Sequence, residues 1–188
     1  VVSLADDIVV HARTREEHDT RLHRALQSLE RAGMTLNEKK CSFGASEINF
    51  LGHRISDIGV DPGRDKVAAI KSAIEPKSVA EMKSFLGLVG YCSKFILDFS
   101  SKTEPLRRLI LGRRPVETIV LNTEERRAFR RLKDDLASAG TLAYFKLGAR
   151  TVLYTDAGPV GLGLVLVQEQ DGENRVICYA SRALTSVE

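Results

Sequence analysis

Short apolar runs organise the first part of the chain. Mostly apolar residues at 1–4 and 8–10 form two runs of strand length. Asp6 and Asp7 stand between these runs, and acidic residues are unfavourable in the interior of a strand. The pattern therefore predicts a β-hairpin that carries this acidic pair at its turn.

A helix and a second hairpin are expected next. Thr14 followed by Glu17 is a capping box, and Gly33 supplies a helix stop. Between them, apolar residues recur at the spacing of one helix face, namely Leu22, Ala25, Leu26, Leu29 and Ala32. Beyond this helix, the segments 41–43 and 48–55 flank a short turn-forming stretch and predict another hairpin.

Asp-Pro-Gly at 61–63 marks a boundary, and after it the apolar residues recur at helical spacing. Pro76 interrupts the pattern, and Ser78 with Glu81 forms a second capping box that opens a new helix. That helix carries a continuous apolar stripe made of Val79, Met82, Phe85, Leu86 and Val89. Residues 63 to about 111 are therefore predicted to form a small helical unit.

A further helix is predicted to begin with Thr123 as its cap. Its apolar face holds Phe129, Leu132 and Leu136, and its other faces carry Arg126, Arg127, Arg130, Arg131 and Lys133. A solvated face is the default interpretation of such a charge run. Contact with phosphate is the alternative, because arginine can grip phosphate with paired donors.

From Thr151 onward, the pattern of apolar residues is again typical of strands. Apolar segments at 152–154, 161–168 and 175–180 are separated by turn-forming residues and predict a three-stranded meander. Asp156 falls at the end of the first of these strands.

The composition is that of a globular protein, with 43% hydrophobic, 28% charged and 6% aromatic residues. The apolar runs are far shorter than the ~20 residues that span a bilayer, so no membrane partner is expected. The three widely separated cysteines fit reduced intracellular thiols, and no secretory signal pattern is present. We therefore expect an intracellular protein, and the net charge of +3 permits a nucleic-acid partner.

The carboxylates are candidates for metal binding, and each has a plainer interpretation. Asp6 and Asp7 cannot both enter a core, because adjacent carboxylates repel each other and are costly to desolvate. A solvated turn explains the pair, and so does a Mg²⁺ site, since Mg²⁺ prefers carboxylate oxygen. Asp156 poses the same choice, because a single Asp at a strand end is usually a turn former. Gly52 fits plain sheet geometry or the close approach of a nucleic-acid backbone.

The order of these features resembles the reverse transcriptase and ribonuclease H region of gypsy-type long-terminal-repeat retrotransposons, as found in their Pol polyproteins. Nearly the whole chain is covered, and several independent motifs in the right order make the resemblance specific. The matching stretches are 6–10 (Asp-Asp-Ile-Val-Val), 35–43, 50–53 (Phe-Leu-Gly-His), 84–89, 128–133, 154–157 (Tyr-Thr-Asp-Ala) and 179–182 (Tyr-Ala-Ser-Arg).

The resemblance implies an α/β (α+β) fold in four parts. Residues 1–61 correspond to the C-terminal part of the polymerase palm, a partial antiparallel sheet with the primer-grip hairpin. Residues 62–111 correspond to a helical thumb, and 112–148 to the connection. Residues 149–188 correspond to the N-terminal part of a ribonuclease H-like domain, a truncated β-meander. We expect the palm sheet to be frayed, because its missing strands would leave apolar edges open.

The resemblance also implies roles for the candidate residues. Asp6 and Asp7 match the two acids of the palm hairpin, where carboxylates hold Mg²⁺ ions in two-metal catalysis. Asp156 matches the first carboxylate of ribonuclease H, whose clustered acids also bind two Mg²⁺ ions. The nucleic-acid-binding residues implied at the primer grip are Phe50, Leu51, Gly52 and His53. The implied partners of the full-length parent are an RNA template, a DNA primer and an RNA–DNA hybrid, in the cytoplasm (in a retroelement particle) or the nucleus.

The chain alone is expected to be inactive. In the family, a third palm carboxylate lies upstream of the hairpin, and the remaining ribonuclease H acids lie beyond residue 188. Both Mg²⁺ clusters should therefore be incomplete in this fragment, whose parent the resemblance implies to be an RNA-directed DNA polymerase. Leu4 stands where the family has Tyr, and Gly158 where it has Ser, which indicates a decayed or divergent copy.

Two other functions stay open. A remnant of a retroelement could bind nucleic acid without catalysis, and its affinity would then weaken as salt rises. An unrelated Mg²⁺-dependent phosphotransferase using Asp6 and Asp7 ranks last, because the chain has no glycine-rich phosphate loop.

Overall fold

The computed structural model describes residues 1–4 and 6–185 of the chain. These residues form two compact units, Val1–Phe50 and Leu51–Glu188. Helices and antiparallel strands are mixed along the chain, as expected for an α+β protein. No helix in the described part is long and apolar enough to cross a membrane.

The first unit begins with the predicted hairpin. Strand β1 pairs antiparallel with β2, and Leu4 lies opposite Asp7. The first helix begins as predicted at Thr14, whose hydroxyl accepts a hydrogen bond of 3.2 Å from the backbone N–H of Glu17. The elements of this unit are β1 (Val2–Leu4), β2 (Asp7–Val9), α1 (Arg15–Arg31), the 3₁₀ turn η1 (Glu38–Lys40) and β3 (Ile48–Phe50).

The apolar side chains of the first unit are incompletely covered. Helix α1 contains no buried residue, and its predicted apolar stripe is only half-buried apart from the exposed Ala32. The large apolar side chains that stand exposed in this unit are Val1, Val2, Leu4, Ile8, Met34, Leu36 and Phe43. This exposure agrees with a partial sheet whose apolar surface has no cover within the unit.

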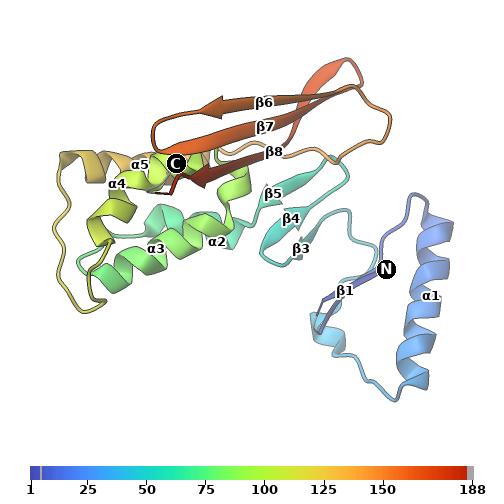
Figure 1. The fold of residues 1–188 in the computed structure, drawn as a ribbon. Coiled ribbons are helices and arrows are strands. Elements are labelled where there is room, and N and C mark those ends of the chain that lie inside the picture. The colour runs from blue at the N-terminus through green and yellow to red at the C-terminus, as the bar shows by residue number, and fades with distance from the viewer. Residues whose placement is uncertain (5, 186–188) are drawn as a thin grey trace. The chain divides into compact units, whose positions relative to one another are not determined.

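The second unit is built around the predicted helices. Figure 1 shows α2–α5 gathered together in this unit, and α5 packs against both α2 and α4. Their shared core includes Met82 and Val89 of α3, Leu106 of α4, and Leu132 of α5, all of them with 0% exposure. The helical elements are α2 (Arg64–Ser72), α3 (Val79–Tyr91), the 3₁₀ turn η2 (Ser93–Phe95), α4 (Phe99–Ile110) and α5 (Thr123–Ala137).

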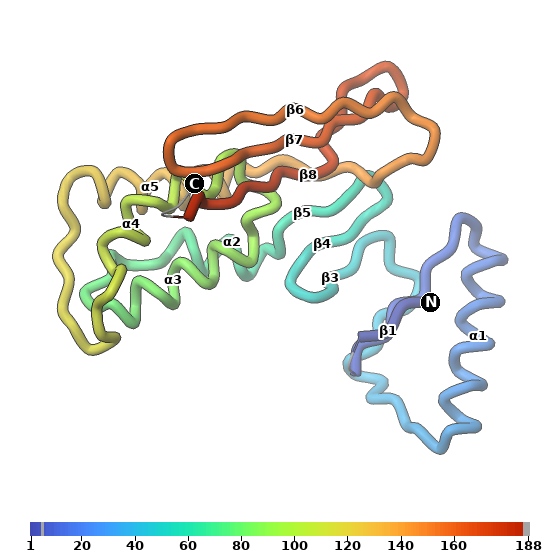
Figure 2. The backbone as a smooth tube through the Cα atoms, in the orientation of Figure 1, coloured from blue at the N-terminus to red at the C-terminus, as the bar shows by residue number. Residues whose placement is uncertain are grey.

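Two groups of strands complete the second unit. Strand β4 (His53–Ile55) pairs antiparallel with β5 (Val60–Pro62). The predicted meander is present as β6 (Thr151–Ala157), β7 (Gly161–Gln170) and β8 (Glu173–Ala183), with β7 in the middle. Figure 2 follows the tube through the two reversals of this meander.

Helix α4 packs against the meander through β7 and β8. Its N-cap residue, Asp98, has a positive φ of 52° and makes no side-chain cap. The cap comes from β8 instead, since the backbone N–H of Ser100 donates to the hydroxyl of Ser181 at 2.8 Å. The start of α4 is therefore fixed by a residue far along the chain.

Two local predictions were wrong in detail. Residues 41–43 form no strand, and the chain between β3 and β4 turns at Leu51 and Gly52, whose φ angles are 49° and 67°. Helix α5 is capped by Asn122 rather than Thr123. The Asn122 side chain accepts from the backbone of Glu125 at 3.0 Å, and the Glu125 carboxylate accepts from the backbone of Asn122 at 2.7 Å. This reciprocal pair satisfies two donors at the helix start, so Thr123 becomes the first helical residue.

Candidate functional site

The acidic pair near the start of the chain lies in the open. Asp6 is in the turn of the β1–β2 hairpin and Asp7 begins β2, and both side chains are exposed. Both side chains line a hollow of about 400 Å³ in the first unit, and Leu22 and Leu26 of α1 line it too. Solvent-accessible carboxylates are the right ligand type for Mg²⁺.

The carboxylates fit a Mg²⁺ site only in part. Asp156 is exposed near the end of β6 and lies opposite Gly163 of β7. Among the described residues, no group of three or more His, Cys, Asp or Glu side chains is placed to hold a metal ion. Asp6 and Asp7 in the first unit and Asp156 in the second thus supply suitable oxygen donors, but neither location forms a complete ligand set.

The turn that was predicted to contact nucleic acid is held by two hydrogen bonds to its backbone carbonyl groups. The hydroxyl of Tyr91, at the end of α3, donates a hydrogen bond to the carbonyl of Leu51. The carbonyl of Gly52 accepts from the N–H of Gly63 at 3.0 Å. Gly52 has a φ of +67°, a conformation that favours glycine, and a Cβ there would also displace the end of the Lys66 side chain, whose Cε would lie 2.0 Å away.

His53 lies against the same tyrosine. Its ring stacks on Tyr91 with 5.0 Å between centroids, and Phe95 packs at a tilt with 5.6 Å between centroids. The Nδ1 atom of His53 is buried and has no hydrogen-bond partner among the described residues. Burial, followed by the positive charges of Lys94 and Lys66, lowers the pKa of His53 below its usual value. The imidazole therefore favours its neutral form.

Two lysines bring positive charge to this turn. The ammonium of Lys66, on α2, lies 4.0 Å from the ring centroid of Tyr91, which is a cation–π contact. Lys94 lies 5.2 Å from the ring centroid of Phe95, and its partial burial lowers its pKa. The second unit thus surrounds the turn with an aromatic stack and two cations, a combination that suits a phosphate backbone and its bases.

The structure brings together Leu51, Gly52 and His53, while Phe50 ends β3 in the first unit and is half-buried. Sequence reasoning missed Tyr91, Lys66 and Lys94. Tyr91 and Leu51 are 40 positions apart, and no local periodicity links such distant residues. The sequence signal was a tyrosine at the end of a helix that carries an apolar stripe.

Residues 1–55 match the reverse transcriptase (RNA-dependent DNA polymerase) family. Residues 121–188 match the RNase H-like domain found in reverse transcriptase. Both regions are therefore similar to parts of reverse transcriptases. The resemblance inferred from the sequence is confirmed, and the chain joins reverse transcriptase and RNase H-like regions in the expected order.

Similar proteins agree with this assignment. The Transposon Tf2-3 and Tf2-7 polyproteins of Schizosaccharomyces pombe are 33% and 32% identical over 173 residues, which is 92% of this chain. The chain spans 13% of the length of these relatives. Their names as transposon polyproteins agree with the resemblance to a Pol polyprotein.

Solved structures support the fold. A foamy viral protease-reverse transcriptase dRH in complex with ds DNA aligns with a TM-score of 0.81 and 25% identity, over 95% of this chain and 31% of that one. The foamy viral protease-reverse transcriptase in complex with an RNA/DNA hybrid gives a TM-score of 0.80 and 25% identity, over 94% of this chain and 24% of that one. The α+β arrangement is therefore a reverse transcriptase fold.

Proposed function

We propose that this chain is the part of a retrotransposon RNA-directed DNA polymerase that carries two palm carboxylates, the primer grip and the start of its ribonuclease H domain. The observation that carries the proposal is the presence of both family regions, in this order, in one chain. The similarity to Tf2 polyproteins over 92% of the chain supports the same assignment.

The two groups of carboxylates would serve different reactions in the parent protein. Asp6 and Asp7 would hold Mg²⁺ for nucleotide addition, and Asp156 would contribute to the Mg²⁺ site of ribonuclease H. Bound Mg²⁺ supplies charge neutralisation at phosphate oxygens and activation of the attacking hydroxyl or water. The exposed positions of all three side chains support these roles, since ions and phosphates can reach them.

The Leu51–His53 turn would hold the primer strand. Its backbone is fixed by Tyr91 and Gly63, so it can be approached closely without being displaced. Lys66 and Lys94 would contribute charge toward the phosphates. The expected ligands are a template–primer duplex and an RNA–DNA hybrid, as in the complexes of the foamy viral relatives.

Primer extension tests the catalytic part of this proposal. The parent protein is expected to extend a DNA primer on an RNA template with Mg²⁺, and Asp7→Asn in that protein should abolish extension. The 188-residue chain should not extend the primer, because its described carboxylates form no cluster of three ligands. Extension by the chain alone would contradict the proposed incompleteness of its sites.

A non-catalytic role in nucleic-acid binding is the second candidate. Leu4 occupies the position where the resemblance places a tyrosine near the template–primer, and this departure favours a divergent copy. A parent protein that binds template–primer but fails to extend it with intact Asp6 and Asp7 would support this candidate over the polymerase.

A further inference from the structure

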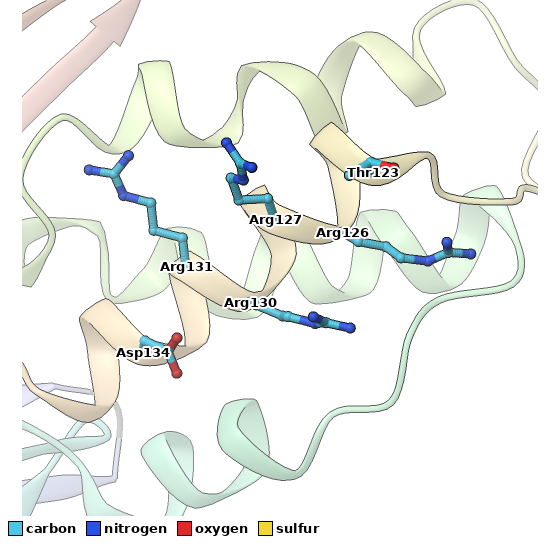
Figure 3. A pocket seen from close by; sticks show the side chains of 6 residues that line it. All are labelled: Thr123, Arg126, Arg127, Arg130, Arg131 and Asp134. Atoms are coloured by element: carbon cyan, nitrogen blue, oxygen red, sulfur yellow. The ribbon is translucent and has the colours of Figure 1, made fainter.

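One face of α5 gathers arginines with few opposing charges. The opposite face buries Phe129, Leu132 and Leu136 in the core, so the arginine side is turned away from the packed helices. Figure 3 shows the four arginine side chains spread along the helix, and they line a hollow of about 580 Å³. This surface, the α5 face, consists of Thr123, Arg126, Arg127, Arg130, Arg131 and Asp134.

Three of these arginines are unpaired. Arg127, Arg130 and Arg131 are exposed, and none makes an ion pair within the described part of the chain. Neighbouring carboxylates are engaged elsewhere, since Glu124 lies 3.5 Å from Arg108 and Asp135 lies 2.6 Å from Lys102. Asp134 is the one carboxylate on the face. The α5 face therefore keeps a positive charge that the fold does not neutralise.

Arg126 differs from the other three. Its Nε atom lies 3.1 Å from both carboxylate oxygens of Glu75, which precedes α3. This ion pair ties α5 to the segment between α2 and α3 and uses the Arg126 charge. Like charges spaced three and four residues apart destabilise a helix slightly, so the fold gains nothing from the spacing of Arg127, Arg130 and Arg131.

We propose that the α5 face binds the phosphate backbone of double-helical nucleic acid. Guanidinium groups match phosphate with two parallel donors, and every cation on this face is an arginine. The face carries no aromatic side chain, although single-strand binding sites depend on aromatic stacking platforms. It also lacks the Trp and Tyr anchors that accompany arginine in protein–protein hot spots. A duplex read through its phosphates, independently of base sequence, is the partner that fits.

The inference rests on the proposed function, because it assigns to that nucleic-acid substrate a contact surface outside the primer grip. The test compares three forms of the 188-residue chain in titrations of a fluorescent DNA duplex at several salt concentrations. The face variant is Arg127→Gln, Arg130→Gln and Arg131→Gln. The matched control, Lys77→Gln, Arg113→Gln and Arg114→Gln, removes the same charge from other exposed positions.

The salt dependence gives the decisive readout. Each lost phosphate contact should reduce the slope of log affinity against log salt by about 1, so the face variant should lose about 3 in slope. The control should keep most of the wild-type slope. Equal losses in the two variants, or a wild-type slope in the face variant, would overturn the inference and leave the proposed function standing. A wild-type chain that binds no duplex would also overturn the inference, whereas the proposed function is tested separately by primer extension with the parent protein.

Competition and a gain of charge complete the test. An unlabelled duplex should displace the labelled one more effectively than a single strand or polyglutamate of equal charge, and equal competition by polyglutamate would overturn the choice of nucleic acid. Glu75→Gln should free Arg126 and tighten duplex binding, with a slope about 1 steeper. Unchanged or weaker binding by Glu75→Gln would also count against the α5 face.

Discussion

The imidazole ring of His53 lies nearly parallel to the phenol ring of Tyr91, with 5.0 Å between centroids and 16° between planes. The Tyr91 hydroxyl also donates a hydrogen bond to the carbonyl of Leu51, two residues before His53. One side chain at the end of α3 therefore supports both the backbone and the side chain of the predicted primer-grip turn. The position of this turn depends on the helical part of the second unit.

Substitutions of Tyr91 separate these two contacts. Tyr91→Phe removes the hydrogen bond to Leu51 and keeps the stack, so the free energy of unfolding should fall by about 0.5–1.5 kcal/mol. Tyr91→Ala also removes the stack with His53, which should cost about 0.5–1.5 kcal/mol more. Urea unfolding measures both changes. Tyr154→Phe, at an exposed position on β6, is the control and should be neutral; equal effects at Tyr91 and Tyr154 would refute the assignment.

The ionisation of His53 should make stability depend on pH. Burial, then Lys94 and Lys66, lower its pKa in the folded state from 6.5, so the unfolded chain takes up the proton first as the pH falls. The stability that depends on a neutral His53 is therefore fully present above pH 6.5. It is lost progressively as the pH drops from 6.5 to the pKa of His53 in the folded state. An NMR titration of the His53 ring should give a midpoint below 6.5.

Lys94→Met provides the control for this titration. Removing one of the two positive charges should raise the pKa of His53, but only in part, because burial is the larger cause. A His53 midpoint at or above 6.5 in the unmodified chain would contradict the packing described for the turn.

Two glycines should respond in opposite ways to alanine. Gly59 has a φ of +150°, and a Cβ there would lie 2.1 Å from the backbone oxygen of Leu142. Gly59→Ala should therefore cost at least about 1–3 kcal/mol from backbone strain, in addition to the clash. Gly87 lies inside α3 with open space around it, so Gly87→Ala should stabilise the protein by about 0.5–1 kcal/mol. Thermal unfolding of the two variants should thus shift in opposite directions.

Loss of the Ser181 hydroxyl should weaken the start of α4. Ser181→Ala removes the acceptor of the Ser100 N–H, and the loss of a helix cap typically costs about 1 kcal/mol. Hydrogen exchange at the Ser100 amide should become faster in this variant. Ser84→Ala, on the exposed side of α3, is the matched control and should leave that amide unchanged. Unaltered exchange in Ser181→Ala would show that the cap contributes nothing.

Local signals predicted most of the elements. The Thr14 and Ser78 caps, the hairpin beside Asp6 and Asp7, and the meander that begins at Thr151 all depend on residues a few positions apart. The cap of α5 was misplaced by one residue, because Asn122 and Thr123 are both good caps and only the bond to Glu125 distinguishes them. The order of the motifs, and not any single one, carried the prediction of the family.

The surroundings of the candidate sites could not be predicted in the same way. Tyr91 reaches Leu51 across 40 positions, and Arg126 reaches Glu75 across 51. Such contacts depend on how helices pack, which periodicity within one helix does not specify. The basic side of α5 was visible in the sequence, but only the structure shows which of its arginines already has a partner. The roles of Asp6, Asp7 and Asp156 stay predictions.

The bond between Ser100 and Ser181 also has a consequence for the order of events during synthesis. The two residues are 81 positions apart, so the ribosome needs roughly 4–16 seconds to reach the second one, at about 5–20 residues per second. Throughout that interval, the Ser100 N–H at the start of α4 lacks its acceptor, the Ser181 hydroxyl. A pause in translation between these codons would prolong this exposed stage, and faster translation would shorten it.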